Sequence, residues 1–363
     1  MATELRVGII GVNRTGGWAA EAHVPAVQDL DRMTLAAVAA SRQETADEAA
    51  HAFGAEKAYA GGFALIADPD IDVVTVATRV PDHKELLLAA AAAGKHVYSE
   101  WPLGAGGSEA RYISDAVHRA GVKHAIGLQL RGSPAVRRAK EIISSGALGR
   151  VLSVSALSTT AGFGPIVPPQ YAYLEDPESF ANLVTIQGAH TLDLLIALVG
   201  RIGFMSALPS RRFPEIQIGE PPQPETRTTY DHLLVQGHLA SNAPFALEVA
   251  GGQGDDTPFH LDVIGQNGTL RLDGGAPRGL QSTRIGLLRD GVRQTIDEGA
   301  LASMADSAVN VGGVYELLRN DIRGGFARTT GFDHAVRLTR LIEDMLAPSG
   351  QSRQTADGSW PES

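Results

Sequence analysis

The feature that most limits what this chain can fold into is an alternation of short apolar segments and helical segments over its first 128 residues. The first apolar segment, Val7 to Ile10, is rich in β-branched residues and ends at a glycine, which is typical of a buried parallel strand. Similar patterns predict strands at 35–40, 72–77, 96–99 and 123–128, and helices at 18–30, 45–53, 84–93 and 108–120. Strands and helices in this order predict a doubly wound parallel sheet with right-handed crossovers.

The pattern changes after residue 128. Helices are expected at 134–144, 183–198, 314–322 and 333–345, strands at 151–157, 202–208, 232–239, 245–249, 260–264 and 269–272, and a glycine- and proline-rich loop at 161–169. Consecutive strands joined by turns such as Gln266-Asn267-Gly268 predict a mainly antiparallel sheet. We therefore expect an α/β domain at 1–128, an α+β domain with a large sheet at 129–347, and a polar tail at 348–363.

Length and composition narrow the class of protein. A chain of 363 residues exceeds what one hydrophobic core usually serves, and a net charge of −10 argues against non-specific nucleic-acid binding. The absence of cysteine excludes disulfides and thiolate metal sites, and no H-E-x-x-H spacing occurs, so no metal is expected. The longest apolar runs, such as 86–93, are far shorter than the roughly 20 residues of a membrane-spanning helix. We expect a cytoplasmic protein without membrane or nucleic-acid partners.

A glycine-rich turn follows the first strand, in the sequence GIIGVNRTGGW. Gly11, Asn13 and Gly16 occupy the three positions of a G-x-G-x-x-G fingerprint, whose tight turn directs main-chain amides at a diphosphate. Asparagine tolerates the left-handed backbone angles that such a turn uses. The turn predicts a dinucleotide-binding Rossmann domain in which residues 11 and 13–17 (Gly11, Asn13, Arg14, Thr15, Gly16, Gly17) contact the cofactor. A glycine turn without a ligand is the alternative.

The end of the second strand bears on which dinucleotide binds. It reads Ala39-Ala40-Ser41-Arg42, without the carboxylate that holds the adenosine ribose of NAD. A hydroxyl and a guanidinium suit the 2′-phosphate of NADP. We therefore predict that NADP(H) is preferred and that NAD(H) is possible; the alternative is that Ser41 and Arg42 are a solvated loop.

The run IDVVTVATRVPDHKELLLAAAAAGKHVYSEWPLG resembles the Gfo/Idh/MocA family of NAD(P)-dependent oxidoreductases. The resemblance continues through RGSPAVRRAKEIISSGALGRVLSV, GAHTLDLLIALVG and DHAVRLTRLIE, which together reach across nearly all of the expected folded chain. Segments such as SEWPLG, NLVTIQGAHTLDLL and YDHLLVQG are similar to the branch of the family that includes the yeast repressor of galactose genes. That repressor is a dinucleotide-binding sensor, whereas bacterial relatives are taken to be dehydrogenases.

The resemblance implies a set of cofactor contacts at the ends of later strands: Thr78, His83, Glu100, Trp101 and Pro102. The family has Glu-Lys-Pro where this chain has Glu100-Trp101-Pro102, so a catalytic lysine is replaced by tryptophan. An indole can donate one hydrogen bond and stack on a ring. Trp101 is thus either a ligand contact or packing between the domains. His83 is either near the cofactor or a residue of a helix start.

The resemblance also assigns His190, in Gly188-Ala189-His190-Thr191-Leu192-Asp193, the role of acid/base. Histidine suits proton transfer because its pKa lies near working pH. The family's aspartate four residues earlier is Ile186 here, so His190 stands alone, with Arg131, Tyr173, Gln187 and Trp101 as candidate substrate contacts. A structural histidine is the alternative. Tyr230-Asp231-His232 is either a titratable cluster or, as we favour, a solvated strand start.

Two functions remain open. The first is an NAD(P)-dependent oxidoreductase that transfers hydride between the nicotinamide and a secondary hydroxyl or ketone of a sugar or cyclic polyol. The second is a non-catalytic NAD(P)-binding sensor, which the replacement of Lys by Trp101 and of Asp by Ile186 favours. We favour the enzyme, since His190 is retained. The open face of an antiparallel sheet is often covered by a partner, so a homodimer or homotetramer through the second domain is expected.

Overall fold

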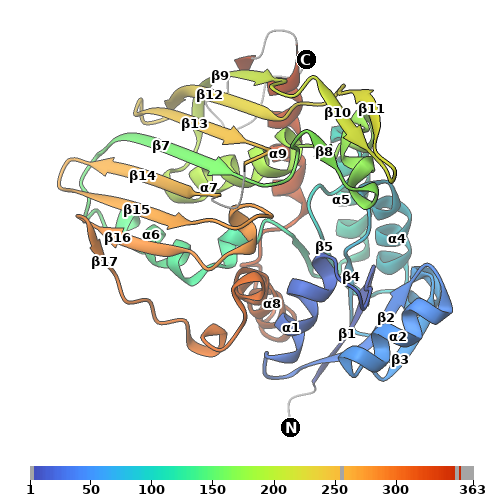
Figure 1. Cartoon of the computed structure of the whole chain (residues 1–363). Coiled ribbons are helices and arrows are strands. Elements are labelled where there is room, and N and C mark those ends of the chain that lie inside the picture. Colours follow the sequence, from blue (N-terminus) through green and yellow to red (C-terminus); the bar gives the residue numbers. More distant parts are fainter. Residues whose placement is uncertain (1–3, 254–256, 348–350, 353–363) are drawn as a thin grey trace. The chain divides into compact units, whose positions relative to one another are not determined.

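The computed structural model describes residues 4–253, 257–347 and 351–352 (Figure 1). The chain divides into two compact units, the first comprising Met1–Gly132 and Glu298–Val336 and the second Ser133–Asp297 and Arg337–Ser363. The sequence-based domain limits therefore need a correction. Residues 129–132 and Glu298–Val336 belong to the nucleotide-type unit, although the pattern placed them in the second domain.

The first unit contains a six-stranded sheet of order β3-β2-β1-β4-β5-β6, parallel throughout, as predicted (Figure 1). Its strands are β1 (Leu5–Ile10), β2 (Met33–Ala40), β3 (Lys57–Ala60), β4 (Val73–Val76), β5 (His96–Ser99) and β6 (His124–Ile126). The order reverses between β1 and β4, the place where open α/β sheets bind ligands. β3 was not predicted, because this edge strand has no fully buried residue and hence no apolar run.

Helices connect these strands: η1 (Ala19–His23), α1 (Val24–Gln28), α2 (Gln43–Phe53), α3 (Gly62–Ile66), α4 (Val80–Ala92), α5 (Gly107–Ala120) and η2 (Gln129–Gly132). The helix expected at 18–30 is a π turn, η1, followed by α1. Pro25 lies in the first turn of α1, where a missing N–H leaves no hydrogen bond unmade.

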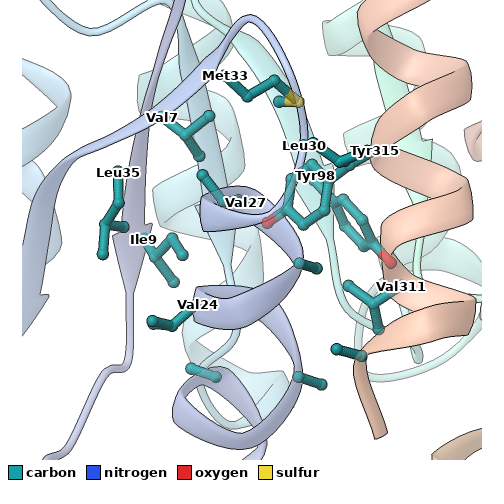
Figure 2. Close-up of a cluster of buried hydrophobic side chains, with 14 of the residues drawn as sticks. Val7, Ile9, Val24, Val27, Leu30, Met33, Leu35, Tyr98, Val311 and Tyr315 are labelled. Atoms are coloured by element: carbon teal, nitrogen blue, oxygen red, sulfur yellow. The ribbon is translucent and has the colours of Figure 1, made fainter. Parts of the chain in front are cut away.

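Helix α8 (Asp306–Gly324) explains why a late segment belongs to the first unit. It packs against η1 and α1, and its Val311 and Tyr315 share a core with β1 and β5 residues such as Ile9 and Tyr98 (Figure 2). The rings of Tyr98 and Tyr315 have centroids 4.8 Å apart. Apolar periodicity predicts such a helix but not the surface that it covers.

The second unit is built on a nine-stranded sheet of order β17-β16-β15-β14-β7-β13-β12-β9-β18, in which only the β7–β13 pair is parallel among the described residues (Figure 1). Its strands are β7 (Val151–Thr159), β9 (Ile202–Ser210), β12 (His232–Leu239), β13 (Pro244–Ala250), β14 (Phe259–Gly265), β15 (Gly268–Gly274), β16 (Gly286–Arg289), β17 (Val292–Arg293) and β18 (Gln351–Ser352). The predicted mainly antiparallel sheet is confirmed. β18 lies within the expected polar tail, whose other residues fall outside the described part.

Helices α6 (Pro134–Ser144) and α7 (Ala189–Val199) belong to this unit, and α7 packs on β7 and β13. α9 (Phe332–Leu346) begins in the first unit and ends in the second. The helical segment 177–199 is long and apolar enough to cross a membrane. However, 83% of its apolar window is buried inside the structure, as expected of a core helix. A small sheet of order β11-β10-β8 was not predicted: β8 (Ile166–Val167) lies in the expected loop, with β10 (Glu215–Ile218) and β11 (Gln223–Thr226).

Candidate functional site

The turn after β1 requires glycine at its first position. Gly11 has a φ of +99°, and a Cβ built on it would lie 2.6 Å from the carbonyl oxygen of Ala77. Its N–H donates to the Ala39 carbonyl at 2.9 Å, which ties the turn to the end of β2. Gly16 and Gly17 follow with φ of +135° and +105°, and no described atom lies within 4 Å of a Cβ built on Gly17. The turn thus faces open space with bare main chain, which is what a diphosphate requires.

Asn13 supports this turn in a way that differs from our expectation. It does not adopt a left-handed backbone conformation; the positive φ angles fall on the glycines. Instead its Oδ1 accepts hydrogen bonds from the N–H and the hydroxyl of Thr15, at 3.0 and 2.9 Å. This side-chain turn fixes residues 13–15 and leaves Arg14 and Thr15 exposed, as a phosphate contact would need.

The residues expected at the adenosine ribose are exposed and weakly held. Ser41 and Arg42 follow β2 directly, and Arg42 Nη2 lies 3.5 Å from Thr45 Oγ1. Arg14, from the glycine turn, reaches the same helix, with its Nε 3.5 Å from Glu48 Oε2. Both contacts are at the long limit of hydrogen bonding, so both guanidinium groups remain available to an anion.

Thr78 and His83 lie at the end of β4 and in the first turns of α4. The Thr78 hydroxyl is buried and has no hydrogen-bond partner among the described residues. The two ring nitrogens of His83 lie 2.9 and 3.1 Å from the carbonyl oxygens of Pro102 and Thr78, and the side chain is buried. Burial lowers the pKa of His83, which favours a neutral ring. A neutral ring can donate to only one of these two carbonyl oxygens, but both of its nitrogens are turned to the chain's own carbonyls.

Glu100, after β5, is the centre of a buried polar network. Its Oε1 lies 2.9 Å from His23 Nε2, and Gln129 Nε2 donates to both of its oxygens at 3.1 and 2.9 Å. His23 Nδ1 lies 2.9 Å from the Tyr315 hydroxyl, which lies 2.7 Å from Thr75 Oγ1. Sequence reasoning identified Glu100 but missed the other four. The one local signal was a histidine on the apolar side of the expected helix 18–30.

Trp101, Pro102 and Arg131 also lie in the first unit. The Trp101 side chain is 6% exposed, and the Pro102 carbonyl accepts the bond from His83 described above. Arg131 is partly buried in η2 and donates through Nη2 to His334 Nε2 at 3.2 Å. The structure thus brings Glu100, Trp101 and Pro102 together by chain continuity, and it gives Arg131 a contact with α9.

In the second unit, His190 lies in the first turn of α7 and is 4% exposed. A π turn, η5 (Val184–Gly188), precedes it, and Ile186 in this turn is half-buried. Gln187 is buried, with Nε2 donating to the Arg278 carbonyl at 2.7 Å and Oε1 lacking a partner among the described residues. Tyr173 is half-buried in the 3₁₀ segment Pro169–Glu175. The acid/base role of His190 and the substrate contacts stay predictions.

The Tyr230-Asp231-His232 cluster needs a correction, because Asp231 is not solvated. It is fully buried and accepts hydrogen bonds from the main-chain N–H groups of Arg212 and Phe213 and from Arg227 Nη1. A buried carboxylate with these donors anchors the start of β12 structurally. Across the described residues, no three His, Asp or Glu side chains gather in a group that could hold a metal ion.

Two family models match the chain, one for each unit's sheet. Residues 5–128 match "Oxidoreductase family, NAD-binding Rossmann fold", and residues 134–274 match "Gal80p, C-terminal domain". Among curated relatives, the dehydrogenase aclE of Aspergillus oryzae is 30% identical, over 76% of this chain and 78% of that protein. The galactose/lactose metabolism regulatory protein GAL80 of Saccharomyces cerevisiae is 29% identical, over 76% of this chain and 68% of its own.

Solved structures show the same fold. Levoglucosan dehydrogenase in complex with NADH and L-sorbose superposes with a TM-score of 0.81 at 23% identity and covers 99% of both chains. Relatives of this chain thus include proteins named as dehydrogenases and proteins named as regulators.

Proposed function

Because this chain belongs to the Gfo/Idh/MocA family of NAD-binding oxidoreductases, near its Gal80 branch, we propose that it oxidises a secondary hydroxyl of a sugar or cyclic polyol, or reduces the matching ketone. The observation that carries the proposal is the glycine turn at residues 11–17, with its positive φ angles and open face at the switch point of the sheet. The relatives that support the substrate class include one named levoglucosan dehydrogenase.

The residues of the first unit fit a nicotinamide dinucleotide. The turn offers main-chain amides for the diphosphate, and the buried, unpartnered Thr78 hydroxyl lies at the end of β4 beside it. We propose NADP(H) as the preferred cofactor, since Arg14 and Arg42 are exposed cations near the start of α2 and no carboxylate ends β2. Titration of both dinucleotides tests this preference, and tighter binding of NAD(H) would overturn it.

We propose that His190 exchanges the hydroxyl proton of the substrate. When bound, the nicotinamide ring supplies the hydride chemistry, so the chain needs only a positioned base and a fixed substrate. His190 lies in the first turn of α7, and the packing of this helix on β7 and β13 fixes where its backbone lies in the second unit. Trp101, which stands where the family has a lysine, carries no charge, so we assign the proton transfer to His190 alone.

The test is a scan of sugars and polyols with NADP and with NAD, following absorbance of the reduced cofactor. Turnover should appear with at least one substrate and fall by about 10²-fold or more in His190→Ala. The matched control is His260→Ala, which removes a partly exposed histidine of β14 and should leave the rate unchanged. Equal activity of His190→Ala and wild type would remove His190 from the mechanism.

A second function has its own support: the resemblance of residues 134–274 to the Gal80p C-terminal domain, together with Trp101 and Ile186. In this case the chain is a sensor that binds NAD(P) and a partner without turnover. Tight dinucleotide binding with no turnover on any substrate of the scan would favour the sensor.

We also propose a cytoplasmic homo-oligomer joined through the open sheet face. Leu234 on β12 lies directly opposite Leu208 on β9, and these side chains are 41% and 60% exposed. An exposed leucine pair on two adjacent strands fits a second copy of the same face. Light scattering should show a dimer or tetramer that Leu208→Glu dissociates; a monomeric wild type would refute it.

A further inference from the structure

Five side chains from five separate segments form one continuous buried hydrogen-bond chain in the first unit. In order along the chain of contacts they are Gln129, Glu100, His23, Tyr315 and Thr75. They come from η2, the end of β5, the π turn η1, α8 and β4. Four of them are at most 1% exposed, and the Glu100 side chain is 13% exposed. Glu100 is therefore the most exposed of these five side chains.

The chemistry of these groups sets the direction of every bond when His23 is neutral. The Glu100 carboxylate can only accept, so His23 carries its proton on Nε2 and donates to it. Nδ1 then accepts from the Tyr315 hydroxyl, which in turn accepts from Thr75. Burial raises the pKa of Tyr315 well above its ordinary value, so this hydroxyl stays a donor. Every donor in this series of hydrogen bonds therefore points toward Glu100.

The surroundings of Glu100 are adapted to this arrangement. A Cβ at Gly127 would lie 2.6 Å from Glu100 Oε1, so only glycine leaves room for the carboxylate there. Gln129 directs its amide N–H₂ at Glu100, and its Oε1 is buried without a partner among the described residues. Leaving such an oxygen unbonded costs about 1–3 kcal/mol, so the Gln129 amide is directed at Glu100 at the expense of its own oxygen.

We propose that His23 and Tyr315 are positioning residues, which hold the Glu100 carboxylate in place as an acceptor for the hydroxyls of the nicotinamide ribose. Glu100 follows β5 on the carboxyl edge of the sheet, where dinucleotides bind. Its lone pairs are only partly used by His23 and Gln129, and it is the one partly exposed member of the network. The inference rests on the dinucleotide binding proposed above and adds residues that no sequence pattern assigned.

The test compares two substitutions at one position. In His23→Gln, the amide N–H₂ can replace Nε2–H toward Glu100 and the amide oxygen can replace Nδ1 toward Tyr315, whereas His23→Leu replaces neither. Calorimetry with the preferred dinucleotide should show about tenfold weaker binding in His23→Leu and a change of no more than about threefold in His23→Gln. Binding of the adenosine half alone, adenosine 2′,5′-bisphosphate or ADP, should stay within about twofold in both variants.

That last measurement separates positioning from a general fold defect, which would weaken the dinucleotide and its adenosine half together. Tyr315→Phe removes a single hydroxyl and provides a second variant if His23→Leu does not fold; it should weaken only the dinucleotide, by roughly threefold. Unchanged dinucleotide binding in His23→Leu and Tyr315→Phe would overturn the positioning role. Equal losses of affinity for the dinucleotide and for its adenosine half would also overturn it. A wild type that binds neither dinucleotide would instead refute the proposed function.

Discussion

Two buried charged clusters, one in each unit, differ in how much of their hydrogen-bonding capacity is used within the chain. In the second unit, Arg227 uses all five of its N–H donors: two on Glu175, one on Asp231, and two on the carbonyl oxygens of Phe163 and Gly164. In the first unit, the Glu100 carboxylate accepts from two side chains, which use only part of its lone pairs, and the side chain is 13% exposed.

The difference separates a buried charge whose hydrogen bonds are all made within the fold from one that keeps acceptor capacity for a ligand, as we propose for Glu100. A guanidinium with every donor bonded has no N–H left to offer a small molecule, and the Arg227 cluster joins the loops around β8 and β12. A carboxylate that is oriented by neighbours but only partly bonded is prepared for a partner from outside the chain.

The largest effect is expected where the saturated cluster is broken. Arg227→Met should lower the free energy of unfolding by about 3–5 kcal/mol, because it leaves Glu175 buried without its cation and leaves Asp231 with only the more distant Arg212, whose Nε lies 3.8 Å away. Arg271→Met is the matched control: it breaks a bidentate pair with Asp262 on the surface and should cost less than about 1 kcal/mol. Urea denaturation gives both values, and similar losses in the two variants would contradict the distinction.

A buried histidine, His124, extends the comparison to pH, because its hydrogen bond as an acceptor can form only when the ring is neutral. Burial lowers the pKa of His124 to about 4, and its Nδ1 accepts from the Phe332 N–H at 3.2 Å. The unfolded chain binds this proton near pH 6.5, so the stability contributed by His124 is present at pH 7 and falls as the pH drops toward 4, by up to about 3 kcal/mol. In His124→Asn, the Oδ1 can accept the same hydrogen bond but does not titrate, so the free energy of unfolding should fall less between pH 7 and 4. If it falls as steeply as in the wild type, His124 is not the source of the pH dependence.

Removing one charge from each cluster tests the assignment of roles directly. Glu100→Gln should weaken dinucleotide binding by about tenfold, since a neutral amide oxygen is a poorer acceptor for ribose hydroxyls than a carboxylate. Asp231→Asn should leave that affinity within about twofold while it destabilises the fold by roughly 1–3 kcal/mol. Calorimetry measures the dinucleotide affinity and thermal unfolding measures the stability of the same samples. Weaker binding in Asp231→Asn than in Glu100→Gln would contradict the assigned roles.

The smallest effect is expected at the exposed cations beside α2. Arg42→Ala should reduce the ratio of NADP to NAD affinity by several-fold, about 1 kcal/mol, because exposed charges are screened by salt. The same titration of Arg32→Ala, an exposed arginine before β2, should leave the ratio unchanged. If the ratio of NADP to NAD affinity is unchanged in Arg42→Ala, Arg42 does not contact the 2′-phosphate.

Much of the fold could be predicted from local pattern. β5, β12 and α6 match the expected segments residue for residue, because each is an apolar or amphipathic run bounded by a break. β11 was missed because all four of its residues are exposed, so no alternation marks it. The place of α8 was missed because periodicity identifies a helix but not the surface it covers.

The candidate site divides in the same way. Gly11 was predictable, since a left-handed turn residue is a local demand of the backbone. The contact of His23 with Tyr315 spans 292 positions in sequence, so no local pattern marks either residue as part of the Glu100 network. The acid/base role of His190 rests on a resemblance and stays a prediction, and the π turn before it gave no signal that spacing alone could detect.

The return of α8 to the first unit has a consequence for how this protein is made. About 165 residues, Ser133–Asp297, separate the two parts of that unit in the chain. At the usual speed of a ribosome, these residues take about 10–30 s to synthesise. During this interval the nascent N-terminal sheet lacks the helix that covers its apolar flank, so the first unit is completed only after the 165 residues of Ser133–Asp297 and α8 itself have been synthesised.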